Sequence, residues 1–289
     1  MVRRQPEETT ATWKEQAAGS SSVHPATPGP RFSVMLWILG RTLPMEQRLE
    51  TVAAAGFSAG ELVREWFTWT PEERRRIVAK KDALHLSFDV MFPSAAPLTD
   101  PAAHAKLADE ITKALPVARE IGCTQFSFRS GARVPGQSRE AEMQTVADAL
   151  KVASEICQRE KISMLLEPVD NLEAKQEAVA QVGEAFDIVR MVGNPELRVL
   201  YDFYHEQRYG GNLIEKLQKN IDLVGTVHIA DVPGRYRPGT GEMNYRNIYR
   251  ELGKLQFRRT IAMEFYPQGD AVAELKAARL EALTAMRTA

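Results

Sequence analysis

The chain has 289 residues, enough for one large domain or two ordinary ones with a substantial core. Its 37 basic and 38 acidic residues give a formal net charge of −1. Nucleic acids and anionic membranes attract a basic surplus, so this balance argues against either as an obligate partner. With two cysteines we expect no disulfide framework and a reducing cytoplasm, and no apolar run reaches the roughly 18 residues of a membrane span.

The first 30 residues differ in composition from the rest of the chain. They are rich in Ser, Thr, Pro, Glu and Gln, and Trp13 is the aromatic residue among them. Arg3-Arg4 suggests a twin-arginine export signal, but no apolar segment comes after it, so we do not interpret the pair in that way. We expect residues 1–30 to form a flexible extension and residues 31–289 to form the folded domain that carries the function.

From residue 32 onwards, short apolar strands alternate with amphipathic helices. The predicted strands cover residues 32–39, 57–63, 84–90, 124–128, 162–167, 197–202, 224–230 and 260–264. The predicted helices cover residues 45–55, 100–121, 138–159, 175–192, 213–221, 248–255 and 271–286, and another begins at Thr70. Apolar strands separated by helices indicate a parallel sheet that is buried on both faces.

Eight such units in roughly 260 residues predict an α/β fold of one domain, a (β/α)₈ TIM barrel. The alternative is an open doubly wound sheet, which normally has a glycine-rich phosphate turn after its first strand. The run Leu39-Gly40-Arg41-Thr42 is not such a turn. We therefore favour the barrel.

Three predicted strands end in a carboxylate, and another contains a histidine. Glu167, Asp202 and Glu264 each follow an apolar run, and His228 lies in the seventh strand. A carboxylate at the end of a buried strand is costly unless it is paired or bound to a cation. One such acid could be a structural ion pair, but the ends of four consecutive strands converge in a barrel. The sequence therefore predicts a metal site, and its oxygen-rich ligands favour Mn²⁺ or Mg²⁺, with Co²⁺ also compatible, over zinc.

The chain resembles the xylose isomerase-like TIM barrel superfamily, and within it the hydroxypyruvate isomerases, from about residue 31 to its end. The resemblance rests on Glu167-Pro168-Val169-Asp170-Asn171, Tyr201-Asp202-Phe203-Tyr204-His205, His228-Ile229-Ala230-Asp231, Pro233-Gly234-Arg235, Pro238-Gly239-Thr240-Gly241-Glu242-Met243-Asn244-Tyr245 and Glu264-Phe265-Tyr266-Pro267. The Pro-Gly-Thr-Gly-Glu-x-Asn-Tyr run is its most specific part. One position departs: hydroxypyruvate isomerases often carry glutamine where this chain has His228, and the related ketose 3-epimerases carry histidine.

The resemblance implies an intramolecular oxidoreductase of the aldose–ketose isomerase type. It would interconvert hydroxypyruvate and tartronate semialdehyde, or a close small hydroxy-keto acid, in carbohydrate metabolism. Glu167, Asp202, His228 and Glu264 would hold the metal. Glu167 and Glu264 would also be the catalytic residues that move a proton by way of an enediolate. The partner would be a small molecule, and a homo-oligomer is compatible with the sequence.

Three candidate substrate contacts lie close to the metal site. His205 matches a family histidine that contacts a substrate oxygen. The forked guanidinium of Arg235 suits a substrate oxygen or carboxylate and would offset the negative charge of the ligands. Glu173 matches a substrate-contacting glutamate of the epimerases, although a solvated acid at the start of a helix explains it equally well.

Further candidates have strong structural alternatives. Glu242 could orient His228 or Arg235, or cap a helix. Glu61, in the second strand, could reach the substrate or pair with an arginine, and His85, in the third strand, could reach the site or be a packed ring. Solvation explains the loop arginines 129 and 133 better than a carboxylate or phosphate contact does, and Trp66, Phe67 and Trp69 fit a pocket wall, a subunit contact or plain burial.

Other functions compete with the hydroxy-keto acid isomerase. A ketose 3-epimerase, another free-sugar isomerase or an inosose dehydratase would share the mechanism. A metal nuclease of the endonuclease IV type would share the barrel, but it needs more histidines at strand ends, and the net charge argues against it. A non-catalytic binding barrel would leave the four predicted ligands unexplained.

Overall fold

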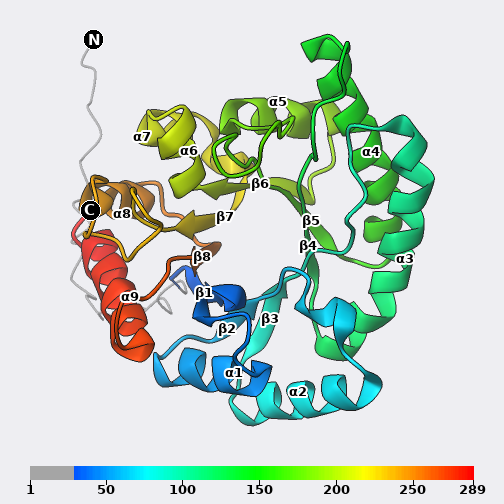
Figure 1. Cartoon of the computed structure of the whole chain (residues 1–289). Coiled ribbons are helices and arrows are strands. Elements are labelled where there is room, and N and C mark those ends of the chain that lie inside the picture. Colours follow the sequence, from blue (N-terminus) through cyan, green and yellow to red (C-terminus); the bar gives the residue numbers. More distant parts are fainter. Residues whose placement is uncertain (1–28) are drawn as a thin grey trace, which may run out of the picture.

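The computed structural model describes residues 29–289, so the extension predicted for residues 1–30 falls almost wholly outside the described part. Eight parallel strands form one sheet in the order β3-β2-β1-β8-β7-β6-β5-β4. A parallel bridge between Met91 and Phe126 joins the two edges and closes the sheet into a barrel ringed by helices (Figure 1). The predicted (β/α)₈ barrel is confirmed.

The strands are short, as is usual for the inner wall of such a barrel. They are β1 Arg31–Met35, β2 Ala59–Glu61, β3 Ser87–Val90, β4 Gln125–Phe128, β5 Ser163–Leu166, β6 Leu197–Asp202, β7 Val224–Ile229 and β8 Thr260–Met263. The α-helices are α1 Met45–Ala54, α2 Pro71–Ala83, α3 His104–Ile121, α4 Arg139–Arg159, α5 Val182–Val192, α6 Phe203–Tyr209, α7 Leu213–Asn220, α8 Tyr245–Lys254 and α9 Ala271–Arg287. The 3₁₀-helices are η1 Leu36–Leu39, η2 Glu65–Thr68, η3 Pro101–Ala103 and η4 Ile221–Leu223.

Local sequence signals set several helix boundaries. Thr70 and Glu73 form a capping box at the start of α2, in which each side chain accepts a hydrogen bond from the other residue's backbone N–H. Ser138 caps α4 by accepting from Ala141 N. Gly122 ends α3 in the left-handed conformation, with a φ of 75° that glycine adopts without strain. These boundaries therefore lie close to the predicted ones.

Several boundaries differ from the prediction, and one helix was missed. The first strand stops at Met35, and residues 36–39 form η1 instead. Helix α5 begins at Val182, so residues 175–181 are not helical. Helix α6 was missed: Asp202 ends β6 and also caps α6 by accepting from Tyr204 N over 2.8 Å. For α6, a polar residue of the site starts a short helix that apolar periodicity does not reveal.

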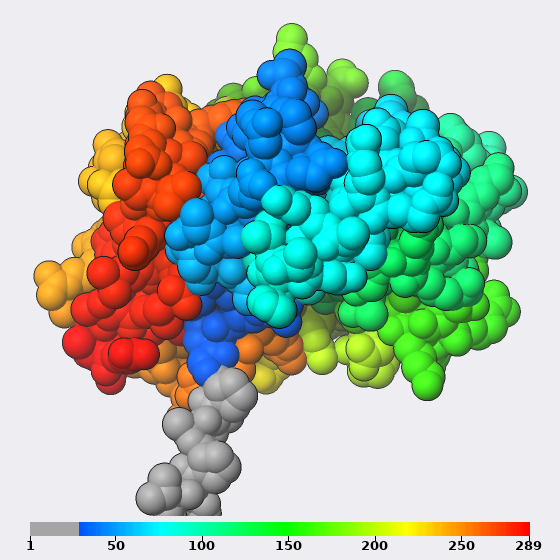
Figure 2. Space-filling view, turned by 90° about the horizontal axis from the view of Figure 1, so that it is seen from below, coloured from blue at the N-terminus to red at the C-terminus, as the bar shows by residue number. Residues whose placement is uncertain are grey.

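The core has two layers, as expected for strands buried on both faces. Val90, Leu165 and Leu200 form a small apolar cluster of their own, separate from the main core. The main core lies between the strands and the surrounding helices. The last helix, α9, packs beside α1 and completes the outer ring (Figure 2). Among residues 29–289, no helix has the length and apolar character needed to cross a membrane.

Candidate active site

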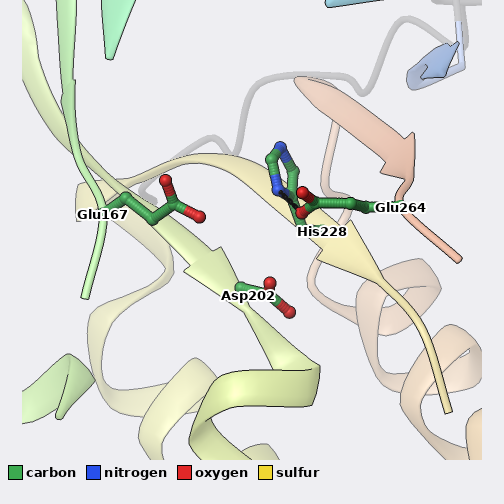
Figure 3. Close-up of side chains that lie close together, drawn as sticks. All are labelled: Glu167, Asp202, His228 and Glu264. Atoms are coloured by element: carbon green, nitrogen blue, oxygen red, sulfur yellow. Dashed lines mark hydrogen bonds and ion pairs between the residues drawn. The ribbon is translucent and has the colours of Figure 1, made fainter. Parts of the chain in front are cut away.

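The structure brings the four predicted metal ligands together at the C-terminal ends of four neighbouring strands. Glu167 directly follows β5, Asp202 ends β6, His228 lies in β7 and Glu264 directly follows β8. Asp202 and His228 are paired in register across β6 and β7. All four side chains are buried, and each offers a ligand atom within 4.8 Å of the others (Figure 3).

Two cationic groups lie among the three carboxylates. Arg235 places Nη2 at 2.9 Å from Asp202 Oδ2 and at 2.7 Å from Glu264 Oε2. Nδ1 of His228 lies 2.5 Å from the same Glu264 oxygen. Arg235 therefore lies where the sequence predicted a cation to offset the negative charge of the ligands. Its guanidinium is in direct contact with two of the predicted ligands.

The donor set fits a divalent cation. Three carboxylates and one imidazole give the oxygen-dominated ligands that Mn²⁺ and Mg²⁺ prefer. The second ring nitrogen of His228 is also held by a carboxylate, because Nε2 lies 3.0 Å from Glu61 Oε2. Glu61 in turn accepts a hydrogen bond from Ser33 Oγ over 2.5 Å. A carboxylate on the far nitrogen is the usual partner of a metal-ligating histidine, and it leaves Nδ1 facing the centre.

The two glutamates have environments that push their pKa values apart. Burial, with the Glu264 carboxylate adding to it, raises the pKa of Glu167 to about 7. Burial also acts to raise the pKa of Glu264, but the charges of Arg235 and His228 outweigh it and hold that pKa well below its usual range. Two carboxyl groups tuned in opposite directions are typical of an acid–base pair.

The loop after β7 is organised by one buried carboxylate. Asp231 accepts hydrogen bonds from the backbone N–H groups of Val232, Gly239, Gly241 and Met243. At Gly241 a Cβ would lie only 2.1 Å from the carbonyl oxygen of Val232, so a side chain does not fit there. These hydrogen bonds to Asp231 bring the backbone close to its carboxylate, which explains the glycines in the run from Pro238 to Tyr245. They also fix the loop that carries Arg235.

His205 and Glu173, two predicted substrate contacts, line the central cavity together with Arg235. His205 is buried, with Nδ1 2.7 Å from Asp170 Oδ2 and Nε2 3.4 Å from Asp202 Oδ2. Glu173 is half-exposed and lies 3.1 Å from Nη1 of Arg235. The cavity has a volume of about 340 Å³ and also reaches Glu167 and Glu264.

Three other predicted contacts lie elsewhere. His85 is exposed in the turn before β3, with a φ of 54°, so its predicted place inside the strand is wrong. That turn is at the N-terminal end of the strands, opposite the cavity. Glu242 is exposed and, among the described residues, its side chain contacts neither His228 nor Arg235. Glu61 does not line the central cavity but bonds to His228.

Two residues of the site received no role from the sequence. Asp170 is fully buried and holds His205, and its position within the Glu167–Asn171 run was the signal that could have revealed it. Trp37 donates its indole N–H to Glu264 Oε1 over 3.1 Å. No pattern marked Trp37, because it lies in a segment predicted as strand that in fact turns into η1.

The comparison with known families agrees with this geometry. The model of the family described as the xylose isomerase-like TIM barrel matches residues 49–286. The chain belongs to the xylose isomerase-like TIM barrel family. It is 26% identical over 257 residues to the hydroxypyruvate isomerase of Escherichia coli, covering 85% of this chain and 97% of that protein. It is likewise 26% identical to a 2-oxo-tetronate isomerase of Pectobacterium atrosepticum, covering 83% and 93% of the two chains. As a family member with such relatives, the chain is an isomerase.

Two solved structures share the fold of this chain. An AP endonuclease, family 2 from Brucella melitensis superposes with a TM-score of 0.76 at 24% identity, covering 85% of this chain and 96% of that one. An L-ribulose 3-epimerase superposes with a TM-score of 0.76 at 17% identity, covering 90% and 96%. Identities this low establish the barrel and leave the reaction to the chemistry of the site.

Proposed function

We propose that this protein is a metal-dependent isomerase that interconverts hydroxypyruvate and tartronate semialdehyde, or the isomers of a close small hydroxy-keto acid. One observation carries the proposal: four buried donors meet at one end of the barrel, and two of them are glutamates on the same cavity. The relatives named for hydroxypyruvate and 2-oxo-tetronate support this substrate class.

Glu167, Asp202, His228 and Glu264 would hold the divalent metal, Mn²⁺ or Mg²⁺ by the chemistry of their atoms. When bound, such an ion polarises a substrate carbonyl and acidifies the proton on the neighbouring carbon. A cavity of about 340 Å³ is large enough for a small hydroxy-keto acid.

The two glutamates would carry the proton. One carboxylate removes the proton from the hydroxyl-bearing carbon, which gives an enediolate, and a glutamate returns a proton to the former carbonyl carbon. Glu167 and Glu264 both line the cavity, so both carboxylates face a substrate held there. Glu264 stays ionised beside Arg235, and the indole of Trp37 fixes its other oxygen.

His205 and Arg235 would hold the substrate oxygens. Asp170 is hydrogen-bonded to Nδ1 of His205. This contact directs Nε2 toward the cavity side, near Asp202. Arg235 is buried and contacts the rings of Trp37 and Tyr204, with its guanidinium carbon 5.6 Å and 4.9 Å from their centroids. A guanidinium held by two rings is preorganised for charge that develops on the enediolate.

The test is a screen of the metal-reconstituted protein by NMR in D₂O. We expect deuterium to enter at the carbon beside the carbonyl of hydroxypyruvate or a four-carbon keto acid. Glu264→Gln should abolish that exchange, whereas the matched Glu206→Gln, a buried glutamate away from the cavity, should retain it. Full activity of Glu264→Gln would contradict the acid–base assignment.

Free ketoses belong in the same screen, because His228 matches the residue of the ketose 3-epimerases. Epimerisation of a free ketose, with no exchange into the keto acids, would replace the proposed substrate class. Calorimetric titration of Mn²⁺ into the metal-free protein tests the ligand set separately from turnover. His228→Ala should lose most of that binding.

A further inference from the structure

The carboxylates that line the central cavity and three of its four lining arginines come from different halves of the barrel. Every carboxylate that lines it, within the described chain, comes from the β5–β8 half: Glu167, Glu173 and Glu264. The β1–β4 half supplies no lining carboxylate but three arginines, Arg41, Arg64 and Arg129. Three of the four lining arginines therefore lie on the side away from the carboxylates, and the fourth, Arg235, is paired with Glu173 and Glu264.

The three arginines come from the loops that follow β1, β2 and β4. Arg64 lies three positions beyond the last residue of β2, and Arg129 directly follows β4. All three are thus presented from the C-terminal ends of the strands, the end at which barrel enzymes bind substrate. Arg64 also lines two neighbouring pockets, so it lies at the boundary that the three pockets share.

Two of these arginines have no anionic partner in the part of the chain that the structure describes. Within residues 29–289, no carboxylate lies within 4.0 Å of the side-chain nitrogens of Arg41 or Arg64. Arg129 differs, because Nη2 lies 2.8 Å from Glu177 Oε2. Most other arginines near the site are paired, as Arg235 and Arg208 are with Glu173. Arg41 and Arg64 therefore keep their donors free for another anion.

Arg41 is linked to the proposed reaction centre through one aromatic ring. Its guanidinium carbon lies 5.1 Å from the centroid of the Trp37 ring, in cation–π contact. The same indole donates to Glu264. Trp37 therefore contacts both Arg41 and Glu264, and all three residues line the same cavity.

We propose that Arg64 and Arg41, with Arg129 at their edge, form a subsite for an oxyanion group of the substrate, a carboxylate or a phosphate. The inference rests on the proposed function and adds an orientation to it. The hydroxy-keto carbons lie between Glu167 and Glu264, and the acid group points toward the arginines. Forked guanidinium donors suit such an oxyanion, and a neutral ketose leaves them without a ligand.

The test compares three-carbon substrates that differ at one group. Hydroxypyruvate and dihydroxyacetone are identical except that a carboxylate in one replaces a hydroxymethyl group in the other, and dihydroxyacetone phosphate carries a phosphate. Proton exchange of each is followed by NMR in D₂O for the wild type, Arg64→Gln and Arg41→Gln. Arg258→Gln is the control, because Arg258 is exposed and precedes β8 at the opposite end of the barrel.

We expect each cavity variant to lower kcat/KM for hydroxypyruvate by about 10- to 100-fold, mainly through KM, and to leave dihydroxyacetone unchanged. An equal or larger loss for dihydroxyacetone phosphate would identify phosphate as a second group that the subsite accepts. The subsite does not exist if kcat/KM falls equally for hydroxypyruvate and dihydroxyacetone in the variants. It does not exist either if kcat/KM for hydroxypyruvate is unchanged.

A separate measurement keeps this inference distinct from the proposed function. If no compound exchanges in the wild type, the proposed function fails, and calorimetric titration with inorganic phosphate and with malonate then decides the subsite. Binding to the wild type and to Arg258→Gln that is lost in Arg64→Gln would support an oxyanion subsite. Absence of binding to the wild type would overturn it. Thermal unfolding of each variant checks that the fold is intact.

Discussion

Glu61 Oε2 lies 3.0 Å from Nε2 of His228, and both side chains are fully buried. The contact links β2 to β7 from opposite parts of the sequence and ties a residue outside the cavity to a predicted metal ligand. Since Ser33 holds the same carboxylate, Glu61 has little freedom to turn away. The ring orientation of His228 is therefore set before any ion binds.

We expect Glu61→Gln to weaken binding of Mn²⁺ by about 10- to 100-fold, because an amide supports the ring less well than a carboxylate. Calorimetric titration of the metal-free variant measures this directly. Glu206→Gln, which changes a buried glutamate that bonds to Val182 N, should bind the ion as the wild type does. Unchanged affinity in Glu61→Gln would contradict a positioning role.

The indole of Trp37 gives a second prediction. Trp37→Phe keeps a ring beside Tyr266 but removes the N–H that holds Glu264. Loss of a hydrogen bond to a carboxylate should lower kcat by about tenfold or more, with a smaller change in KM. Trp69→Phe is the matched control, since Trp69 packs on Phe88 outside the cavity. A loss of the same size in both variants would indicate a packing effect instead.

The lowered pKa of the Asp170 carboxyl leads us to predict that its contribution to the free energy of unfolding depends on pH. Burial acts to raise the pKa of its carboxyl, but the hydrogen bond with His205 and the charge of Arg208 outweigh burial and lower that pKa below 3.8. Because the folded pKa is below the unfolded one, the stabilisation is present above pH 3.8 and is lost as pH falls through the folded pKa.

Asp170→Asn should therefore be less stable than the wild type by about 1–3 kcal/mol near neutral pH. The difference should shrink as the pH falls to about 3. Urea unfolding across that range measures it. A difference that grows on acidification would show that the sign is wrong. The same variant should also raise KM, because His205 loses the group that orients it.

The loop after β7 gives a prediction about packing. Gly241→Ala should destabilise the protein by about 1–3 kcal/mol, because its Cβ would meet the carbonyl oxygen of Val232 at 2.1 Å. Gly183→Ala is the control: it lies in α5, and a Cβ there meets nothing within 4 Å. The control should be neutral or slightly stabilised. Thermal unfolding compares the two, and equal behaviour would contradict the close approach.

The sequence by itself determined the barrel and the four predicted ligands. Apolar runs of strand length and capping residues such as Thr70 and Ser138 act locally, so they can be recognised without knowing what packs against them. The ligands Glu167, Asp202 and Glu264 follow from the same logic, because parallel strands of a barrel present their C-terminal ends at one face.

The tertiary structure alone decided which side chains meet. The pairing of Glu61 with His228 and of Trp37 with Glu264 depends on strand register and side-chain direction across the closed sheet, which no short window of sequence contains. His85 was placed wrongly because a left-handed turn residue before β3 looks like part of the strand. The position of Arg41, Arg64 and Arg129 across the cavity from its carboxylates likewise appears only when the strands close into a barrel.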